Sequence, residues 1–281
     1  MAILESAMLD IRSILVHLDD PQSAVPRLQL AHRLALAHDA SVTVVYAAVP
    51  SLTFAPFPEE GGALVVNALM DIDEQRRRDT REAFEKTAAA TGLRAQWTEL
   101  EGAAGIANLL GLRAMYADLL VLGQHQTTSA GGAPGDFAEM VLARSGRSAV
   151  LVPFAIDPPA SLRRVAIAWK ETPEAARALA AALPILRRAS EVHVLSWGGE
   201  PTQWRPRLQH YLGSHGVDPI WHDGGPEPKY IGEIILSTVA DLSCDMLVMG
   251  CYGHSRAREW LLGGATRTLL SSMTLPVLMA H

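Results

Sequence analysis

The residue types and spacings best suited to chemistry lie near the C-terminus, in residues 249–267. This stretch contains glycines at 250, 253, 263 and 264, and it holds one histidine and three arginines against a single acid, Glu259. Glycines let the backbone approach an anion closely and adopt turns that are closed to other residues. The locally basic, glycine-rich stretch therefore predicts a phosphate or another anion as its ligand.

Such a loop needs a strand before it and a helix after it. The segment 243–250, with its apolar run at 246–249, predicts a strand, and residues 264–272 predict a helix with Thr266 in its first turn. Ligands of open parallel sheets bind at the carboxyl ends of strands, where the strand order reverses. A helix N-terminus adds free N–H groups and the positive end of a dipole, and Thr266 would add a hydroxyl.

The chain repeats itself. The apolar runs 12–18 and 163–169 are each followed by a helical pattern, at 23–38 and 173–189, and then by a short β-branched run. Gly123 and Gly250 end similar runs 127 residues apart, and Val152 and Met279 are separated by the same distance. This shared register predicts a duplication. The first copy has a longer middle, which we expect to be a Pro/Gly-rich loop at 48–66 followed by a long, charged helix at 67–91.

Each copy reads as strands that alternate with helices, and the strands are nearly continuous apolar runs. This pattern is typical of an α/β fold with a parallel sheet covered by helices on both faces. We expect two domains, residues 1–153 and 163–281, joined by the proline-rich linker 153–162. One large doubly wound domain remains the alternative.

The spacing Gly250-x2-Gly253-x9-Gly263 resembles the nucleotide loop of the universal stress protein family, in which Ser or Thr follows the last glycine. The closing segment TLPVLMAH also resembles the family's final strand, and the similarity covers both halves. The resemblance implies an open five-stranded sheet of order 3-2-1-4-5 in each copy. It also implies that the copies pack as a pseudo-dimer in which strand 148–152 meets strand 276–280.

Family membership would imply a cytoplasmic stress-response protein that binds ATP or ADP, with or without Mg²⁺, in its C-terminal domain. The predicted nucleotide-binding residues are Ala168, Lys170, Met249, Gly250, Gly253, His254, Ser255, Gly263, Gly264, Ala265 and Thr266. Any reaction would be slow hydrolysis or self-phosphorylation, because no carboxylate pair or P-loop lysine motif is present. No catalytic residue is therefore assigned.

Several positions depart from the family pattern. Gly264 stands where a Ser or Thr is usual, and Lys170 stands where nucleotide binders of the family carry an Asp that faces adenine. Lysine has no acceptor for the adenine amino group, so phosphate binding is favoured over adenine recognition. The first copy retains its acid, Asp19, but lacks the second glycine after Gly123, and Asp136 near the expected helix start would repel a phosphate. We expect no ligand there.

Composition excludes several other classes of function. With a net charge of −6, the chain lacks the excess of basic residues expected of a general nucleic-acid binder. Its two cysteines can form neither a disulfide framework nor a four-Cys zinc site. The histidines show no metal-ligating spacing, so no metal is assigned. We expect no signal peptide, because Glu5 and Asp10 interrupt the first apolar stretch and no basic segment precedes it. We expect no membrane helix, because every apolar stretch ends well short of the roughly 18–20 residues that one needs.

Some alternatives remain open at this stage. The chain could instead be a non-catalytic protein-interaction module that binds no nucleotide, or a metabolite sensor with residues 48–66 as a lid. We expect Cys251 to be a small loop residue rather than a reactive thiol, and Trp169 and Trp197 to serve packing. We expect the charged run 73–86 to form a solvated helix face. Whether the full chain forms a homodimer is left open.

Overall fold

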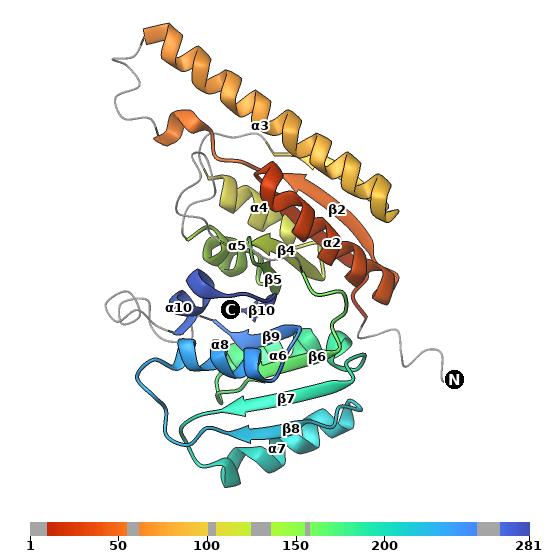
Figure 1. The fold of residues 1–281 in the computed structure, drawn as a ribbon, viewed down its shortest axis with the longest axis vertical. Helices are drawn as coiled ribbons and strands as arrows, with labels where there is room; N and C mark the ends of the chain where they lie inside the picture. Colours follow the sequence, from red (N-terminus) through yellow and green to blue (C-terminus); the bar gives the residue numbers. More distant parts are fainter. Residues whose placement is uncertain (1–9, 55–61, 101–104, 125–135, 155–157, 252–264) are drawn as a thin grey trace. The chain divides into compact units, whose positions relative to one another are not determined.

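The computed structural model describes residues 10–54, 62–100, 105–124, 136–154, 158–251 and 265–281 (Figure 1). These residues divide into two compact units. The N-terminal unit comprises Ile11–Arg147, and the C-terminal unit comprises Ser148–His281 together with Asp10.

The N-terminal unit has a parallel sheet in the order β3-β2-β1-β4. Its strands are β1 (Ser13–Leu18), β2 (Ser41–Tyr46), β3 (Ala95–Glu99) and β4 (Leu119–Gly123). Its helices are α2 (Pro21–His38), the short 3-10 helix η2 (Ser51–Phe54), α3 (Gly62–Thr91), α4 (Ile106–Ala114) and α5 (Phe137–Ser145).

The C-terminal unit has a sheet in the order β5-β10-β9-β6-β7-β8, in which β5 alone is antiparallel to its described neighbour. Its strands are β5 (Ala149–Val152), β6 (Arg164–Ala168), β7 (Glu191–Ser196), β8 (Ile220–Asp223), β9 (Met246–Gly250) and β10 (Val277–Ala280). Its helices are α6 (Pro173–Leu186), α7 (Pro201–Ser214), α8 (Ile231–Asp241) and α10 (Ala265–Ser272).

The predicted α/β class and strand order are confirmed. In the C-terminal unit the order β8-β7-β6-β9-β10 is the expected 3-2-1-4-5 pattern, and the N-terminal unit follows it through its first four strands. The predicted pairing of the final strands is also confirmed, because Leu151 of β5 lies opposite Val277 of β10 in an antiparallel ladder. This ladder covers backbone groups of β10 that would otherwise form an exposed sheet edge. The expected domain limits stay a prediction.

The strands form where the sequence is apolar without interruption. Ile14, Val16 and Leu18 of β1 are fully buried, and four of the five residues of β9 are buried as well. Neighbouring strand residues point to opposite faces, so burial of consecutive residues requires helices on both sides. The core of each unit therefore lies in the layers between its sheet and its helices.

Helix α2 begins two residues before the expected helix 23–38. Asp20 caps it by accepting a hydrogen bond from the backbone N–H of Gln22 at 2.6 Å, and Pro21 occupies the first helical turn. The expectation for residues 48–66 is wrong in part. Residues 51–54 form η2, and α3 begins at Gly62 rather than at residue 67, because the apolar residues 62–66 continue the helix. Residues 55–61 lie outside the described residues.

Candidate functional site

Each unit has one point at which its strand order reverses, which we call its switch point. In the N-terminal unit the chain runs outward from β1 to β3 and returns on the other side of β1 as β4. In the C-terminal unit β6 and β9 are neighbours in the same way, with Ala168 opposite Met249 at their carboxyl ends. Ligands of open α/β sheets bind outside the strand ends at such points, so these two positions are the candidate sites.

At the N-terminal switch point, the chain's own Arg27 occupies the space beside the strand ends. Its Nη1 donates to the Asp19 carboxylate at 2.7 Å and to the backbone oxygen of His17 at 2.9 Å. The Arg27 and Asp19 side chains are only 6% and 9% exposed. Burying such a pair is tolerable only when both charges are matched and hydrogen-bonded. The carboxylate of Asp19 is therefore engaged within the protein.

Gly123 at the end of β4 makes this arrangement possible. A Cβ atom at this position would overlap the Arg27 guanidinium, so no larger residue fits unless Arg27 moves. Beneath the ion pair, His17 is almost fully buried, bonds to the backbone oxygen of Ala47 at 2.8 Å and packs its ring on Phe137. Burial lowers the pKa of His17 below its ordinary value, which keeps a second cation out of the cluster.

At the C-terminal switch point, backbone rather than a side chain lies against the strand end. A Cβ atom on Gly250 would overlap the backbone N of Ala175 and would lie 2.6 Å from the carbonyl carbon of Glu174. The first turn of α6 therefore rests directly on the end of β9. Helix packing alone requires glycine at position 250, so this glycine is no independent sign of a ligand.

Lys170 follows β6 at the same edge and forms an ion pair with Glu227. Its Nζ lies 3.0 and 3.1 Å from the two carboxylate oxygens, and the two side chains are 54% and 45% exposed. Glu227 belongs to the segment after β8 and also lies close to Gly198 after β7. The positive charge of Lys170 is thus matched within the unit, and a phosphate would have to compete with Glu227 for it.

The other predicted site residues fall into two groups. Thr266 is in the first turn of α10 with 6% exposure, next to Ala265, where the helix begins. Met249 is buried at the end of β9. The remaining predicted residues lie outside the described residues; they are Gly253, His254, Ser255, Gly263 and Gly264.

Two further expectations concern residues near this edge. Cys251 is buried, and its Sγ lies 3.2 Å from the backbone oxygen of Ala280, as suits a small packing residue. Trp197 packs against Gly224, where any Cβ atom would overlap the indole ring. The indole Nε1 of Trp169 is buried and has no hydrogen-bond partner among the described residues.

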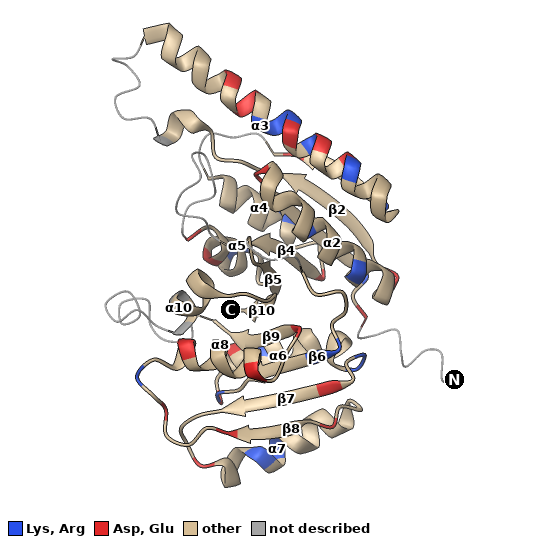
Figure 2. Ribbon diagram, viewed as in Figure 1, with Lys and Arg blue, Asp and Glu red and all other residues tan. Residues whose placement is uncertain are grey.

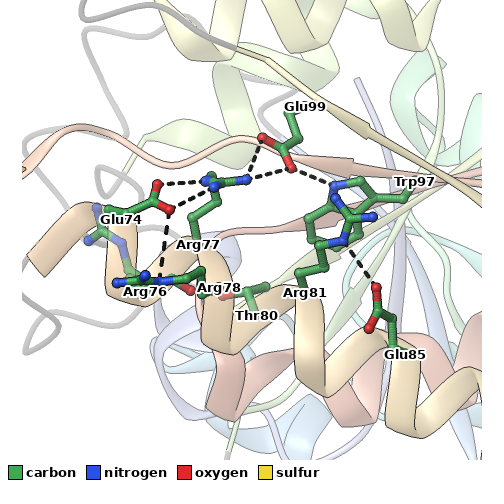
Figure 3. A network of polar contacts seen from close by, with 9 residues as sticks. All are labelled: Glu74, Arg76, Arg77, Arg78, Thr80, Arg81, Glu85, Trp97 and Glu99. Atoms are coloured by element: carbon green, nitrogen blue, oxygen red, sulfur yellow. Dashed lines mark hydrogen bonds and ion pairs between the residues drawn. The ribbon is translucent and has the colours of Figure 1, made fainter. Parts of the chain in front are cut away.

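Most ion pairs of the charged residues in α3 join two residues of that same helix. Figure 2 shows acidic and basic residues alternating along this helix. Arg77 donates to Glu74 at 2.7 Å and to Glu99 of β3 at 3.2 Å, and Glu99 also accepts from the Trp97 indole at 2.8 Å (Figure 3). Arg81 pairs with Glu85 one turn along the helix. These contacts attach α3 to the end of β3 and account for the expected solvated face.

Two properties of the described part of the chain concern metals and membranes. No group of three or more His, Cys, Asp or Glu side chains within it could hold a metal ion. None of its helices has both the length and the apolar content needed to cross a bilayer.

Comparison with known proteins decides the family. The model of the universal stress protein family matches residues 10–153 and 228–281, which is more than half of the chain. The chain belongs to the universal stress protein family. The match includes residues 10–153 of the first copy and, in the second copy, the segment from before α8 through β9, α10 and β10.

Solved structures of other proteins, a universal stress protein among them, share this fold. One from Archaeoglobus fulgidus DSM 4304 is similar with a TM-score of 0.72 and 14% sequence identity, over 97% of each chain. A functionally unknown protein from Pseudomonas aeruginosa PAO1 is similar with a TM-score of 0.60 and 16% identity, over 97% of this chain and 93% of that one. No curated protein sequence matches the chain significantly. At these identities the structural similarity supports the fold alone.

Sequence reasoning did not identify Arg27 and Glu227. Arg27 lies within a helical pattern whose other basic residues suit a solvated face, and Glu227 lies 57 residues from its partner Lys170. The sequence held only an indirect signal for Arg27. The first copy has an acid at the end of its first strand, Asp19, but lacks the glycine spacing of a phosphate loop, so this acid needs another partner.

Proposed function

We propose that this universal stress protein acts in a stress response by binding one phosphate ligand per chain, ATP, ADP or a related molecule, at the carboxyl ends of β6 and β9. The observation that carries the proposal is the difference between the two switch points. Arg27 fills the N-terminal one, whereas at the C-terminal one the glycine-rich stretch 250–264 leads from β9 into α10.

The proposed ligand is defined mainly by its phosphates. The N-terminus of α10 supplies backbone N–H groups and a positive dipole end, with Thr266 in its first turn. The half-exposed pair of Lys170 and Glu227 stands at the end of β6, where Glu227 offers carboxylate oxygens as acceptors. A ligand base or sugar would therefore meet the Lys170–Glu227 pair rather than a single strand-end carboxylate.

One site per chain follows from the buried ion pair. Displacing the Arg27 guanidinium would leave Asp19 buried without its cation, which is costly. Asp136 immediately precedes α5 and would oppose a phosphate at that helix start. We therefore expect a stoichiometry near one nucleotide per chain rather than two.

The direct test is calorimetric titration of the full chain with Mg-ATP and with ADP, together with analysis of small molecules released on denaturation. The test variant is Gly263→Asp, which would place a carboxylate in the proposed cradle. Its matched control is Gly213→Asp, because Gly213 is exposed on α7 with open space around it. We expect about one site, an affinity weakened at least about tenfold in Gly263→Asp, which is about 1.4 kcal/mol, and no change in the control. Absence of both heat and released nucleotide would refute the proposal.

A second candidate function is a protein-interaction module, which one observation favours. The first turns of α3 expose large apolar side chains, including Leu64 at 85% and Met70 at 61%. Exposed apolar residues that gather on one element mark interaction surfaces. Replacing Leu64 and Met70 by Gln would abolish partner capture under this hypothesis and leave nucleotide binding unchanged, which separates it from the first.

A further inference from the structure

A chain of polar side chains crosses three strands of the C-terminal sheet. Arg164 of β6 lies 3.3 Å from Glu191 of β7, and the same Glu191 oxygen lies 3.5 Å from Nε2 of His193. Nδ1 of His193 then lies 3.0 Å from Nε2 of His222 on β8. The two imidazoles are thus joined by a hydrogen bond, with a carboxylate at the far side of the first ring.

The imidazole pair lies on the face of the sheet opposite α7. Trp221 faces α7, where it bonds to Gln209, and side chains alternate along a strand, so His222 points the other way. Register places His193 opposite Ile220, which is 47% exposed on the same face as His222. No described helix is drawn over this face of β7 and β8 in Figure 1. Solvent protons therefore reach the His222 side of the pair.

Strand β8 depends on this contact more than an inner strand would. It has four residues, and its one described neighbour in the sheet is β7. His193 is only 5% exposed, and its buried Nε2 has no hydrogen-bond partner among the described residues, although a Glu191 oxygen lies 3.5 Å away. The imidazole bridge thus adds a side-chain link to the backbone ladder of β7 and β8.

Counting protons shows what this bridge tolerates. Two neutral imidazoles carry two N–H groups, one of which fits between the rings and one of which can face Glu191. A third proton on the outer nitrogen of His222 leaves the bridge intact. A fourth proton would set two N–H groups against each other across 3.0 Å. The hydrogen bond therefore survives one added proton and not two.

We propose that Glu191, His193 and His222 form a proton-counting latch that holds edge strand β8 to β7 and releases it when both imidazoles are charged. The species that this latch binds is the proton, which is taken up by the imidazole nitrogens. Release would expose the backbone edge of β7, a surface that can pair with another strand. The latch would thus couple acidification to a change at one edge of the C-terminal sheet, independently of the proposed nucleotide site.

The surrounding charges act mainly at the Glu191 end. Arg164 partly neutralises Glu191, while Asp245 before β9 accepts hydrogen bonds from the backbone N–H groups of Arg163 and Arg164. Cys244 lies near the same cluster, and burial raises the pKa of its thiol to about 11, so it stays neutral here. All of these described groups lie at the Glu191 end of the cluster, and His222 is the imidazole on the solvent side.

The direction of the titration follows from these contacts. Burial, and then the charge of His193, lower the pKa of His222 below its ordinary value of 6.5. The folded state therefore binds this proton more weakly than the unfolded state does. The contribution of neutral His222 to stability is complete at a pH above its pKa in the unfolded state. It is lost as the pH falls from that value to the lower pKa of His222 in the folded state.

The test uses the full chain and two measurements. The first is hydrogen exchange of the β8 backbone amides at roughly pH 7.5 and roughly pH 4, corrected for the intrinsic rate. The lower pH is needed because the second proton on a coupled pair binds only in more acidic solution than the first. The variant is His222→Gln, which keeps an N–H donor for His193 but does not titrate. The matched control is His210→Gln, because His210 is exposed on α7. The second is ¹⁵N NMR of the imidazoles in the unaltered protein.

We expect acid to reduce β8 protection in the unaltered protein and in His210→Gln, and to leave it largely unchanged in His222→Gln. The ¹⁵N spectra should show coupled titration of the two rings in separate steps. Equal acid loss in His222→Gln, or two rings that titrate independently, would overturn the proposal. If His222→Gln does not fold, the ¹⁵N titration of the unaltered protein decides by itself.

Discussion

Replacing Arg27 by Met tests the reason why the N-terminal switch point is closed. Methionine retains a long apolar side chain but removes the charge and the guanidinium hydrogen bonds to Asp19 and to the backbone oxygen of His17. The substitution leaves the carboxylate of Asp19 buried without this cation. We therefore expect a large loss of stability from a change that keeps most of the side-chain volume.

The size of the loss follows from the geometry. Two unit charges 2.7 Å apart attract by about 6 kcal/mol at an effective dielectric constant near 20, and the cost of desolvating both groups offsets part of this. Removing one partner of a buried pair typically costs about 3–5 kcal/mol, because the other charge remains buried. We expect Arg27→Met to lower the free energy of unfolding of the N-terminal unit by that amount.

The assay is urea unfolding monitored by hydrogen exchange in β1 and β4, because only Trp97 of the six tryptophans lies in the N-terminal unit. The matched control is Arg81→Met, which removes an exposed ion pair to Glu85 on α3 and should cost about 0.5 kcal/mol or less. Asp19→Leu combined with Arg27→Met removes both charges, and should cost less than the sum of the two single changes by about 2 kcal/mol or more.

A result in which Arg27→Met and Arg81→Met lose the same small amount would refute this reasoning. It would mean that water reaches the Arg27 pair and screens it as it does a surface pair. Additive losses in the double variant would likewise show that the two charges are not coupled.

Three other predictions concern single positions. Gly250→Ala should lower the free energy of unfolding by about 1–3 kcal/mol, because the new Cβ would overlap the start of α6. The control Gly213→Ala, in the open part of α7, should raise it by about 0.5–1 kcal/mol. Equal effects of the two changes in urea unfolding would contradict this. Asp20→Ala should cost about 1 kcal/mol through loss of the α2 cap, and an unchanged urea midpoint would argue against that capping role. Cys244, whose pKa burial raises to about 11, should react far more slowly with iodoacetamide near pH 8 than a free cysteine does, and a rate like that of free cysteine would contradict it.

Much of the fold could be predicted from the order of residue types along the chain. Uninterrupted apolar runs identified the strands, and the equal separations of Gly123 from Gly250 and of Val152 from Met279 indicated the duplication. The family resemblance then predicted the sheet order and the pairing of β5 with β10. These features depend on local patterns of hydrophobicity and on spacing, which the sequence states directly.

The start of α3 was predicted less well. The glycines and prolines of residues 48–66 predict a loop through residue 66, yet the helix begins at Gly62. The apolar side chains of residues 62–66 are mostly exposed, so burial does not explain the extension. Continuation of the backbone hydrogen bonds already formed by the rest of α3 is enough to include them, because adding residues to an existing helix is easier than starting one.

The order of residue types predicts which strand ends and glycines of the second copy form a candidate phosphate site. The packing of distant segments is what shows that Arg27 closes the matching point in the first copy, that Lys170 pairs with Glu227, and that His193 bonds to His222. The physical reason is that a charged or titratable side chain has no fixed role in a local pattern. Its role depends on which distant group burial brings within a few ångströms of it.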